Sequence, residues 1–222
     1  MIDLQTLTRT YLQAAISLSV REHRADAPAV QAVQERTYIG RDNALKKWLG
    51  SYRVTRFRGS DEAVATVLKF ADEVRCDPYV RLSYDELISN FDSLHEKCLS
   101  IVRRNNKRNF RDLSSFTSKS LWCCYPSAVP IYDRLTQNSV WILSRLADIG
   151  PTMVHSSSHR YSQFADVWLA MYNRVLPIIN EADLQSYLYP VRVFDKILWL
   201  IAQPNYNRDP TKVSLAAGAA KL

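Results

Sequence analysis

A chain of 222 residues can form one large domain or two small ones, and 47% apolar with 23% charged residues excludes a disordered protein. Because no run of about 18 apolar residues occurs, we expect no helix that crosses a membrane. The net charge of +7 favours an anionic partner, most often nucleic acid. The first residues lack a basic stretch followed by an apolar one, so we expect no secretory signal and a cytoplasmic protein.

The four cysteines show no spacing typical of a metal site. Two of them are adjacent and none forms a C-x-x-C pair, which argues against zinc and iron–sulfur patterns. We expect buried, reduced thiols, no metal and no cofactor. The cysteines are Cys76, Cys98, Cys123 and Cys124.

Apolar residues that recur at steps of three and four predict an all-α fold, a multi-helix bundle of about eight helices. The first stripe predicts a helix over residues 3–20. A polar break is expected at 21–28, followed by a short helix over 29–37. Residues 44–49 predict one or two further helical turns.

Residues 38–59 are the least helical part, since they hold three of the chain's five glycines. Within them, residues 52–58 are rich in arginine and β-forming residues, but their alternation is imperfect. We expect at most a minor β-element there. Its arginines have two interpretations: solvated side chains on an edge strand or loop, or contacts to phosphates.

Two helices carry clear start signals. Ser60, followed by two acidic residues, is a plausible N-cap and predicts a helix to Ala71, before a break at 77–78. Ser83 repeats the signal and predicts a long amphipathic helix to Val102.

A basic run follows at residues 103–111, with five positive residues and no acid. Cations favour helix C-terminal ends, so a solvated helix end is one interpretation. An anion-binding patch is the other, because the run directly precedes the central segment of the chain. The candidate phosphate contacts in this run are Arg103, Arg104, Lys107 and Arg108.

Two helices are expected around the centre of the chain. The first, capped by Asp112 or Ser114, runs to Cys124 and ends at Pro126. The second has Pro130 in its first turn, where the missing N–H of proline is tolerated.

The C-terminal part predicts three more helices. One covers residues 161–176, and Pro177 ends or kinks it. A short helix is expected over 181–189, and Pro190 starts the last one. The polar, alanine-rich tail after residue 204 is expected to be flexible.

We expect one all-α domain over residues 1–204, followed by the flexible tail at 205–222. Within the domain, residues 1–105 form an N-terminal helical part. Residues 106–204 form the part that carries the central segment, residues 115–133.

The central segment is an apolar, aromatic-rich run with Lys119 near its start and Asp133 at its end. Burial lowers the pKa of a lysine, and a neutral amine is a nucleophile that can form a Schiff base. An aspartate one helix later can offset positive charge or move a proton. Both side chains can then face one cleft. The alternative is a peripheral lysine and an acid in the first turn of a helix.

The same segment also carries a recognisable motif: Ser118-Lys119-Ser120-Leu121, then Pro126, then Pro130-Ile131-Tyr132-Asp133. It resembles the pattern S-K-x-L-x-x-x-x-P-x-x-x-P-I-Y-D of the helix–hairpin–helix DNA glycosylase superfamily. It is most similar to the 8-oxoguanine glycosylase-like bacterial branch. Residues 195–199 are similar to the final helix of that branch, and the likeness covers roughly residues 110–200.

The resemblance implies roles for several residues. In that superfamily the lysine attacks the anomeric carbon of the sugar and the aspartate assists departure of the base, which implies these roles for Lys119 and Asp133. The base is flipped out of the duplex, and the Schiff base permits strand cleavage by β-elimination. The candidates for binding the base are Trp122, Tyr132, Trp141 and Gln137. Core packing is the alternative for the aromatic ones.

Two features depart from the superfamily pattern. A glycine-rich turn usually holds a phosphate just before the lysine, whereas residues 112–117 contain no glycine. Phosphate binding would then use hydroxyls, with Ser118 as a candidate, or the basic run. The branch commonly has a histidine two residues after the aspartate, where this chain has Leu135. Arg134, which is also a candidate phosphate contact, and Gln137 are the candidates to replace it.

We therefore expect a DNA glycosylase, bifunctional with β-lyase activity, that excises an oxidised or otherwise modified base from double-stranded DNA. Its setting would be DNA repair or defence against phages with modified DNA. The alternative from another class is a non-catalytic nucleic-acid-binding module on the same helical scaffold. A helical protein-interaction domain is the third interpretation, and a basic chain fits it less well.

Overall fold

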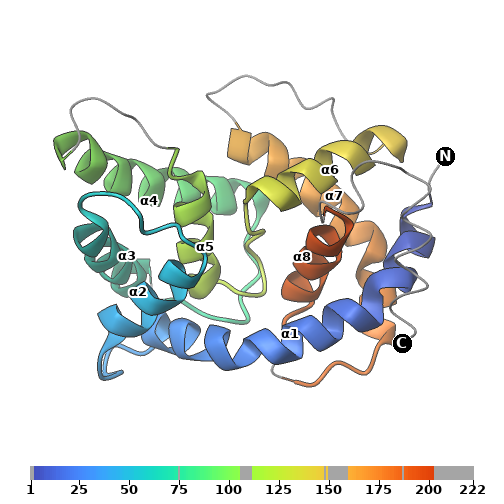
Figure 1. The fold of residues 1–222 in the computed structure, drawn as a ribbon, viewed down its shortest axis with the longest axis horizontal. Helices are drawn as coiled ribbons and strands as arrows, with labels where there is room; N and C mark the ends of the chain where they lie inside the picture. The colour runs from blue at the N-terminus through green and yellow to red at the C-terminus, as the bar shows by residue number, and fades with distance from the viewer. Residues whose placement is uncertain are drawn as a thin grey trace. The chain divides into compact units, whose positions relative to one another are not determined.

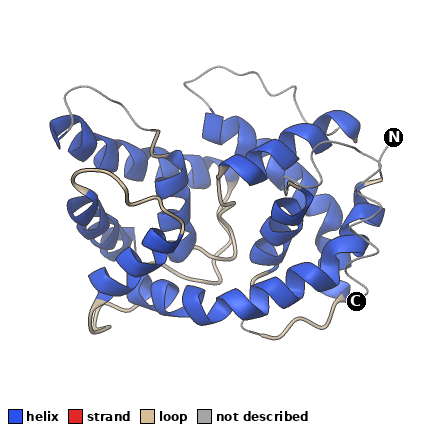
Figure 2. Ribbon diagram, viewed as in Figure 1, coloured by secondary structure: helices blue, strands red, loops and turns tan. Residues whose placement is uncertain are grey.

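The computed structural model describes residues 3–74, 76–105, 112–147, 149, 160–186 and 188–202. Within these residues the chain forms eight α-helices and no β-strand (Figures 1 and 2). The all-α prediction of about eight helices is confirmed. The described ranges contain no helix with both the length and the apolar character that crossing a bilayer requires.

The contacts within the chain form two compact units. Unit 1 combines Met1–Glu22 with Tyr132–Leu222, and unit 2 is the continuous stretch His23–Ile131. Helix α1, Leu4–Gln34, contributes its first part to unit 1 and the remainder to unit 2. The expected single domain over residues 1–204, with parts 1–105 and 106–204, stays a prediction.

The polar break predicted at 21–28 is wrong, because α1 continues through it with Pro28 inside the helix. Proline removes one backbone hydrogen bond and crowds the preceding turn. Residues just after it, including Ala29, Val30 and Val33, are buried. Their burial offsets the cost of the proline and extends the helix to Gln34.

Unit 2 is organised around its last helix, α5. It contains α2 (Arg41–Ser51), α3 (Ser60–Val74), α4 (Tyr84–Asn105) and α5 (Ser114–Cys124). Helix α5 contacts α2, α3 and α4, and ten of its eleven residues are buried. A helix that is covered on most sides has no single apolar stripe, which explains why polar residues of α5 lie in the core.

The start signals read from the sequence are confirmed at α4. The Ser83 N–H donates to Glu86 Oε2 at 2.8 Å, and the Glu86 N–H donates to Ser83 Oγ at 3.2 Å. This reciprocal pair is a capping box, which satisfies amide groups that the first turn leaves free. At α5 the N-cap is Leu113 and not Asp112 or Ser114 as predicted, although the Ser114 N–H donates to Asp112 Oδ1 at 2.8 Å.

Residues 52–58 form turns rather than a strand. Arg53 has a φ of 58° and Gly59 a φ of 85°, values that an extended strand does not allow. Gly59 also lies against α4, where a Cβ atom would come within 2.8 Å of Ile101 Cγ2 and Asn105 Nδ2. Glycine is therefore required at this turn by both conformation and space.

Unit 1 contains α6 (Arg134–Leu146), α7 (Arg160–Glu181) and α8 (Pro190–Ile201), together with the start of α1. Each of the three C-terminal helices contacts the other two. Helix α8 begins with proline at its N-terminal end, as predicted.

Two predictions in this unit are wrong, and of the two outcomes predicted for Pro177, an end or a kink of the helix, the end is excluded. Helix α6 begins at Arg134 and not at Pro130, because Asp133 caps the helix at that point. Pro177 lies inside α7, where its buried neighbours Ile178 and Ile179 keep the helix together. The described part of residues 181–189 forms tight turns after α7 ends, with the Leu188 N–H donating to the Gln185 carbonyl at 2.8 Å.

Candidate functional site

Lys119 lies in the middle of α5 and is 2% exposed. Its Nζ donates a hydrogen bond to Ser115 Oγ at 2.9 Å, one helical turn earlier. The same nitrogen lies 5.3 Å from the centroid of the Tyr52 ring, within the range of a cation–π contact. Inside unit 2, a hydroxyl group and an aromatic ring therefore surround the amine.

Two further candidates on α5 occupy core positions. Trp122 is 1% exposed and stacks on Trp48, with ring centroids 5.6 Å apart and an interplanar angle of 16°. The Ser118 hydroxyl is buried and donates to the Ser115 carbonyl at 3.3 Å. The buried, stacked position of Trp122 favours the core-packing interpretation. Ser118 would have to become exposed before its hydroxyl could reach a phosphate.

A histidine that the sequence analysis did not single out lies beside α5. His95 Nδ1 is 3.1 Å from Thr117 Oγ1, and its ring stacks on Phe91 at 5.4 Å. Burial lowers the pKa of His95, although Asp112 and other nearby carboxylates oppose that effect. The sequence offered one sign of this position: His95 follows Phe91 by four residues, which places both side chains on the same face of α4.

Asp133 is the N-cap of α6 and is half-buried. One carboxylate oxygen accepts the N–H of Leu135 at 3.0 Å and the N–H of Thr136 at 2.9 Å. The Thr136 hydroxyl lies 3.1 Å from the same oxygen. Three groups on α6 thus fix the orientation of this carboxylate.

A network of buried charges on α8 reaches the same threonine. Thr136 Oγ1 lies 3.4 Å from Asp195 Oδ1, and Arg192 donates to Asp195 Oδ2 at 3.0 Å. Arg192 also donates to Glu22 at 2.9 Å, and Lys196 forms an ion pair with Glu22 at 2.6 Å. Arg192 and Glu22 were not among the residues predicted from the sequence. The sequence signal for them was that Asp195 and Lys196 follow Arg192 by three and four residues, on a helix that is otherwise mostly apolar.

The remaining base-binding candidates differ in exposure. Tyr132 is 5% exposed and packs edge-on against Phe164, with ring centroids 5.0 Å apart, which favours a core role. Trp141 and Gln137 are half-buried on α6. The Arg145 guanidinium lies 4.3 Å from the centroid of the Trp141 ring.

The basic candidates are exposed but form ion pairs. Arg103 bonds Glu96 at 2.6 Å, and Arg104 pairs with Glu62. Arg134 is exposed at the start of α6. Exposed pairs of this kind are worth about 0–1 kcal/mol, so a phosphate can compete for the arginines. Two further candidates, Lys107 and Arg108, lie outside the described residues.

Lys119 belongs to unit 2 and Asp133 to unit 1, so a shared cleft for the two side chains stays a prediction. In the part of the chain that the structure describes, no group of three or more His, Cys, Asp or Glu side chains is placed to hold a metal ion. Comparisons with protein-family models, with curated proteins and with solved structures find no match to this chain.

Proposed function

We propose that the protein is a DNA glycosylase with β-lyase activity and that Lys119 is its nucleophile. The observation that carries the proposal is the position of this lysine: it is 2% exposed, in contact with a hydroxyl and an aromatic ring within its unit. Burial in general disfavours the charged form of an amine, and the neutral amine is the form that attacks carbon.

The reaction has two stages. The neutral amine attacks C1′ of the sugar while the bond from C1′ to the base breaks, and the base leaves with that electron pair and takes up a proton. The sugar ring then opens to give a Schiff base between C1′ and the lysine. Loss of a proton from C2′ then breaks the C3′–O bond, and the downstream strand leaves with a 5′ phosphate. Water finally hydrolyses the Schiff base and restores the amine.

Asp133 would offset the positive charge that develops on the sugar as the base departs. Its carboxylate is held by two N–H groups and one hydroxyl of α6, which suits a group that must keep a fixed orientation. Gln137 lies one turn further along the same helix and is a candidate to contact the flipped base.

DNA as the partner is supported by charge. The chain carries a net charge of +7, and phosphate contacts dominate the affinity of proteins for nucleic acid. Exposed Arg134 lies directly after Asp133 and is suited to contact a phosphate near the target nucleotide. The base itself is an oxidised or otherwise modified one.

Borohydride trapping tests the proposal. The protein is incubated with duplexes that carry an abasic site or one of a panel of modified bases, and borohydride reduces any Schiff base to a stable adduct. We expect an adduct with the wild-type protein and none with Lys119→Met. As a matched control, Lys69→Met removes an exposed lysine of α3 and should leave the adduct unchanged. An adduct that persists in Lys119→Met would contradict the proposal.

A second candidate function, a non-catalytic nucleic-acid-binding module, is favoured by the burial of Lys119. A side chain with 2% exposure also fits a purely structural role. This candidate predicts no adduct on any duplex, together with DNA binding that weakens steeply with salt. The same panel, measured by binding as well as by trapping, separates the two functions.

A further inference from the structure

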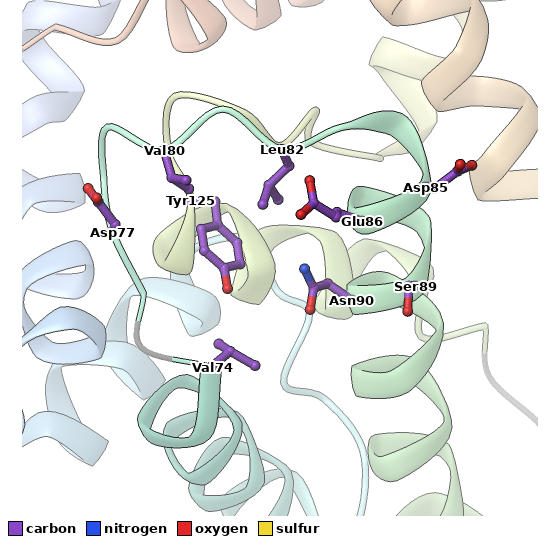
Figure 3. A pocket seen from close by; sticks show the side chains of 9 residues that line it. All are labelled: Val74, Asp77, Val80, Leu82, Asp85, Glu86, Ser89, Asn90 and Tyr125. Carbon is purple, nitrogen blue, oxygen red and sulfur yellow. The ribbon is translucent and has the colours of Figure 1, made fainter.

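A pocket of about 610 Å³ lies in unit 2, next to the C-terminal end of α5 (Figure 3). Its walls come from the end of α3, the connection from Asp77 to Leu82 and the first turns of α4. Tyr125, the residue that follows α5, contributes its ring. The volume falls in the range of about 300–1,000 Å³ that is typical of sites for small ligands.

Tyr125 is the buried polar group of this pocket. It is 5% exposed, and Figure 3 shows its ring among Val74, Val80 and Asn90. Its hydroxyl forms no side-chain hydrogen bond with any described residue. Burial raises the pKa of this phenol, and the nearby thiols and Glu86 add to the effect, so the hydroxyl stays neutral. Its oxygen is free to accept a hydrogen bond from a ligand.

The charge of the pocket is negative in a chain that is positive overall. Asp77, Asp85 and Glu86 line it, and no lysine, arginine or histidine is among the described residues of its lining. None of the three carboxylates forms an ion pair with the part of the chain that the structure describes. The three carboxylates are exposed and lie next to apolar side chains, and their uncompensated negative charge favours a cationic ligand.

Glu86 and Asn90 extend from α4 toward Tyr125 in Figure 3. The N–H and the hydroxyl of Ser83 both donate to Glu86 Oε2, and these bonds lower the pKa of Glu86, which keeps it ionised. Glu86 Oε1 has no hydrogen-bond partner among the described residues. A carboxylate oxygen, an amide oxygen and a phenol oxygen thus lie close to one side of the pocket.

We propose that this pocket binds an organic cation, an ammonium or guanidinium group on a short hydrocarbon body. The cationic N–H groups would donate to Glu86, Asn90 and Tyr125, and the hydrocarbon part would lie against Val80 and Leu82. A metal ion fits less well, because it needs oxygens about 2.0–2.6 Å from one point, whereas Figure 3 shows Asp77 and Asp85 at opposite ends of the pocket.

The same chemistry has two sources, a free small molecule and a basic side chain of a peptide. We would therefore measure binding by titration calorimetry at low salt with two pairs of probes. Butylguanidine is compared with butylurea, its uncharged isostere. A blocked Gly-Arg-Gly peptide is compared with the same peptide that carries citrulline. Each pair differs by one charge, so shape and apolar contact stay matched.

We expect the cationic member of at least one pair to bind at least about tenfold more tightly than its neutral isostere. Binding of butylguanidine assigns the pocket to a free cation, and binding of the peptide alone assigns it to a basic side chain. Equal binding of the charged and neutral members, or binding of none of the four probes, would overturn the proposal.

Three variants locate the binding. Glu86→Gln keeps the capping box, because glutamine can replace glutamate there, and Tyr125→Phe keeps the ring. Each variant should lower the affinity for the cationic probe at least about fivefold, because Glu86→Gln removes a charge and Tyr125→Phe removes an acceptor. Asp92→Asn removes an exposed charge elsewhere on α4 and should change nothing. Unchanged affinity in both pocket variants, with normal circular dichroism, would place the binding outside this pocket.

Discussion

Lys119 on α5 and Lys196 on α8 are both buried, at 2% and 4% exposure, but their surroundings differ. Lys196 forms an ion pair with Glu22 at 2.6 Å. Within unit 2, Lys119 lies 2.9 Å from the Ser115 hydroxyl and 5.3 Å from the centroid of the Tyr52 ring. One buried lysine is thus part of a network of full charges, and the other contacts neutral groups in its unit.

This difference separates two uses of a buried cation. A carboxylate partner stabilises the charged form of a lysine, which suits a structural link between helices. A hydroxyl can accept from an ammonium group and can also donate to a neutral amine, so it tolerates both protonation states. Lys196 thus fits a structural link in unit 1, whereas Lys119 is the lysine proposed to carry out chemistry.

The largest effect is expected on strand cleavage. With a duplex that already contains an abasic site, Lys119→Met should slow β-elimination at least about a thousand-fold, because the nucleophile is lost. Lys196→Met, checked for folding by circular dichroism, should retain cleavage. Gel analysis of the cleaved strand gives both rates. The comparison fails if Lys196→Met loses cleavage and Lys119→Met keeps it.

The next effect concerns stability. Arg192→Met leaves Glu22 and Asp195 without their shared guanidinium, and loss of one partner from a buried charge network costs about 3–5 kcal/mol. Arg9→Met removes an exposed arginine that pairs with Glu181 at 3.3 Å, and it should cost at most about 1 kcal/mol. Urea denaturation measures both free energies of unfolding. Equal costs for the two variants would show that the α8 network has no structural role.

A smaller change separates the two roles of Asp133. Asp133→Ala removes an N-cap and should cost about 1 kcal/mol, whereas Asp133→Asn keeps the cap and should cost a few tenths. The proposed function predicts that both variants release the modified base much more slowly. Ser83→Ala, which removes a cap in unit 2, is the control for lost stability alone. Normal base release by Asp133→Asn would leave Asp133 with its capping role only.

The smallest effect is a pH dependence of stability. The pKa of His95 is lowered in the folded protein by burial, so the folded state holds fewer protons than the unfolded chain just below pH ~6.5. The stability from neutral His95 is present above that pH and is lost as the pH falls through the lowered pKa. Urea denaturation across pH 7 to 5 should show this loss, and His95→Gln should flatten it. An identical pH profile in the variant would exclude His95 as the cause.

The sequence predicted much of the fold from local signals. Ser83 with Glu86, and proline at the start of α8, both act through backbone groups of their own helix and lie where they were expected. The buried position of Lys119 was one of two interpretations of its apolar neighbours, the other being a peripheral lysine. Signals that depend only on nearby residues are readable without knowledge of the packing.

The predictions that failed involve packing between distant parts. Pro28 was expected in a polar break and Pro177 at an end or a kink of its helix, but buried residues beside each proline keep the helix continuous. Trp122, a candidate to stack on a base, packs on Trp48, which favours its core-packing alternative, and its role in base binding stays a prediction. The pairing of Arg192 with Glu22 joins residues 170 positions apart. The residues next to Arg192 and Glu22 in the sequence do not indicate that the two side chains pair.

Mass spectrometry of the trapped complex tests the central claim most directly. Trypsin cleaves after Lys119 in the free protein, but a lysine that is attached to the sugar resists cleavage. We predict that the borohydride-reduced adduct on abasic duplex yields one modified peptide that spans residues 112–134 with an uncut Lys119. An adduct on any other lysine, with residues 112–119 and 120–134 recovered as separate unmodified peptides, would contradict the account.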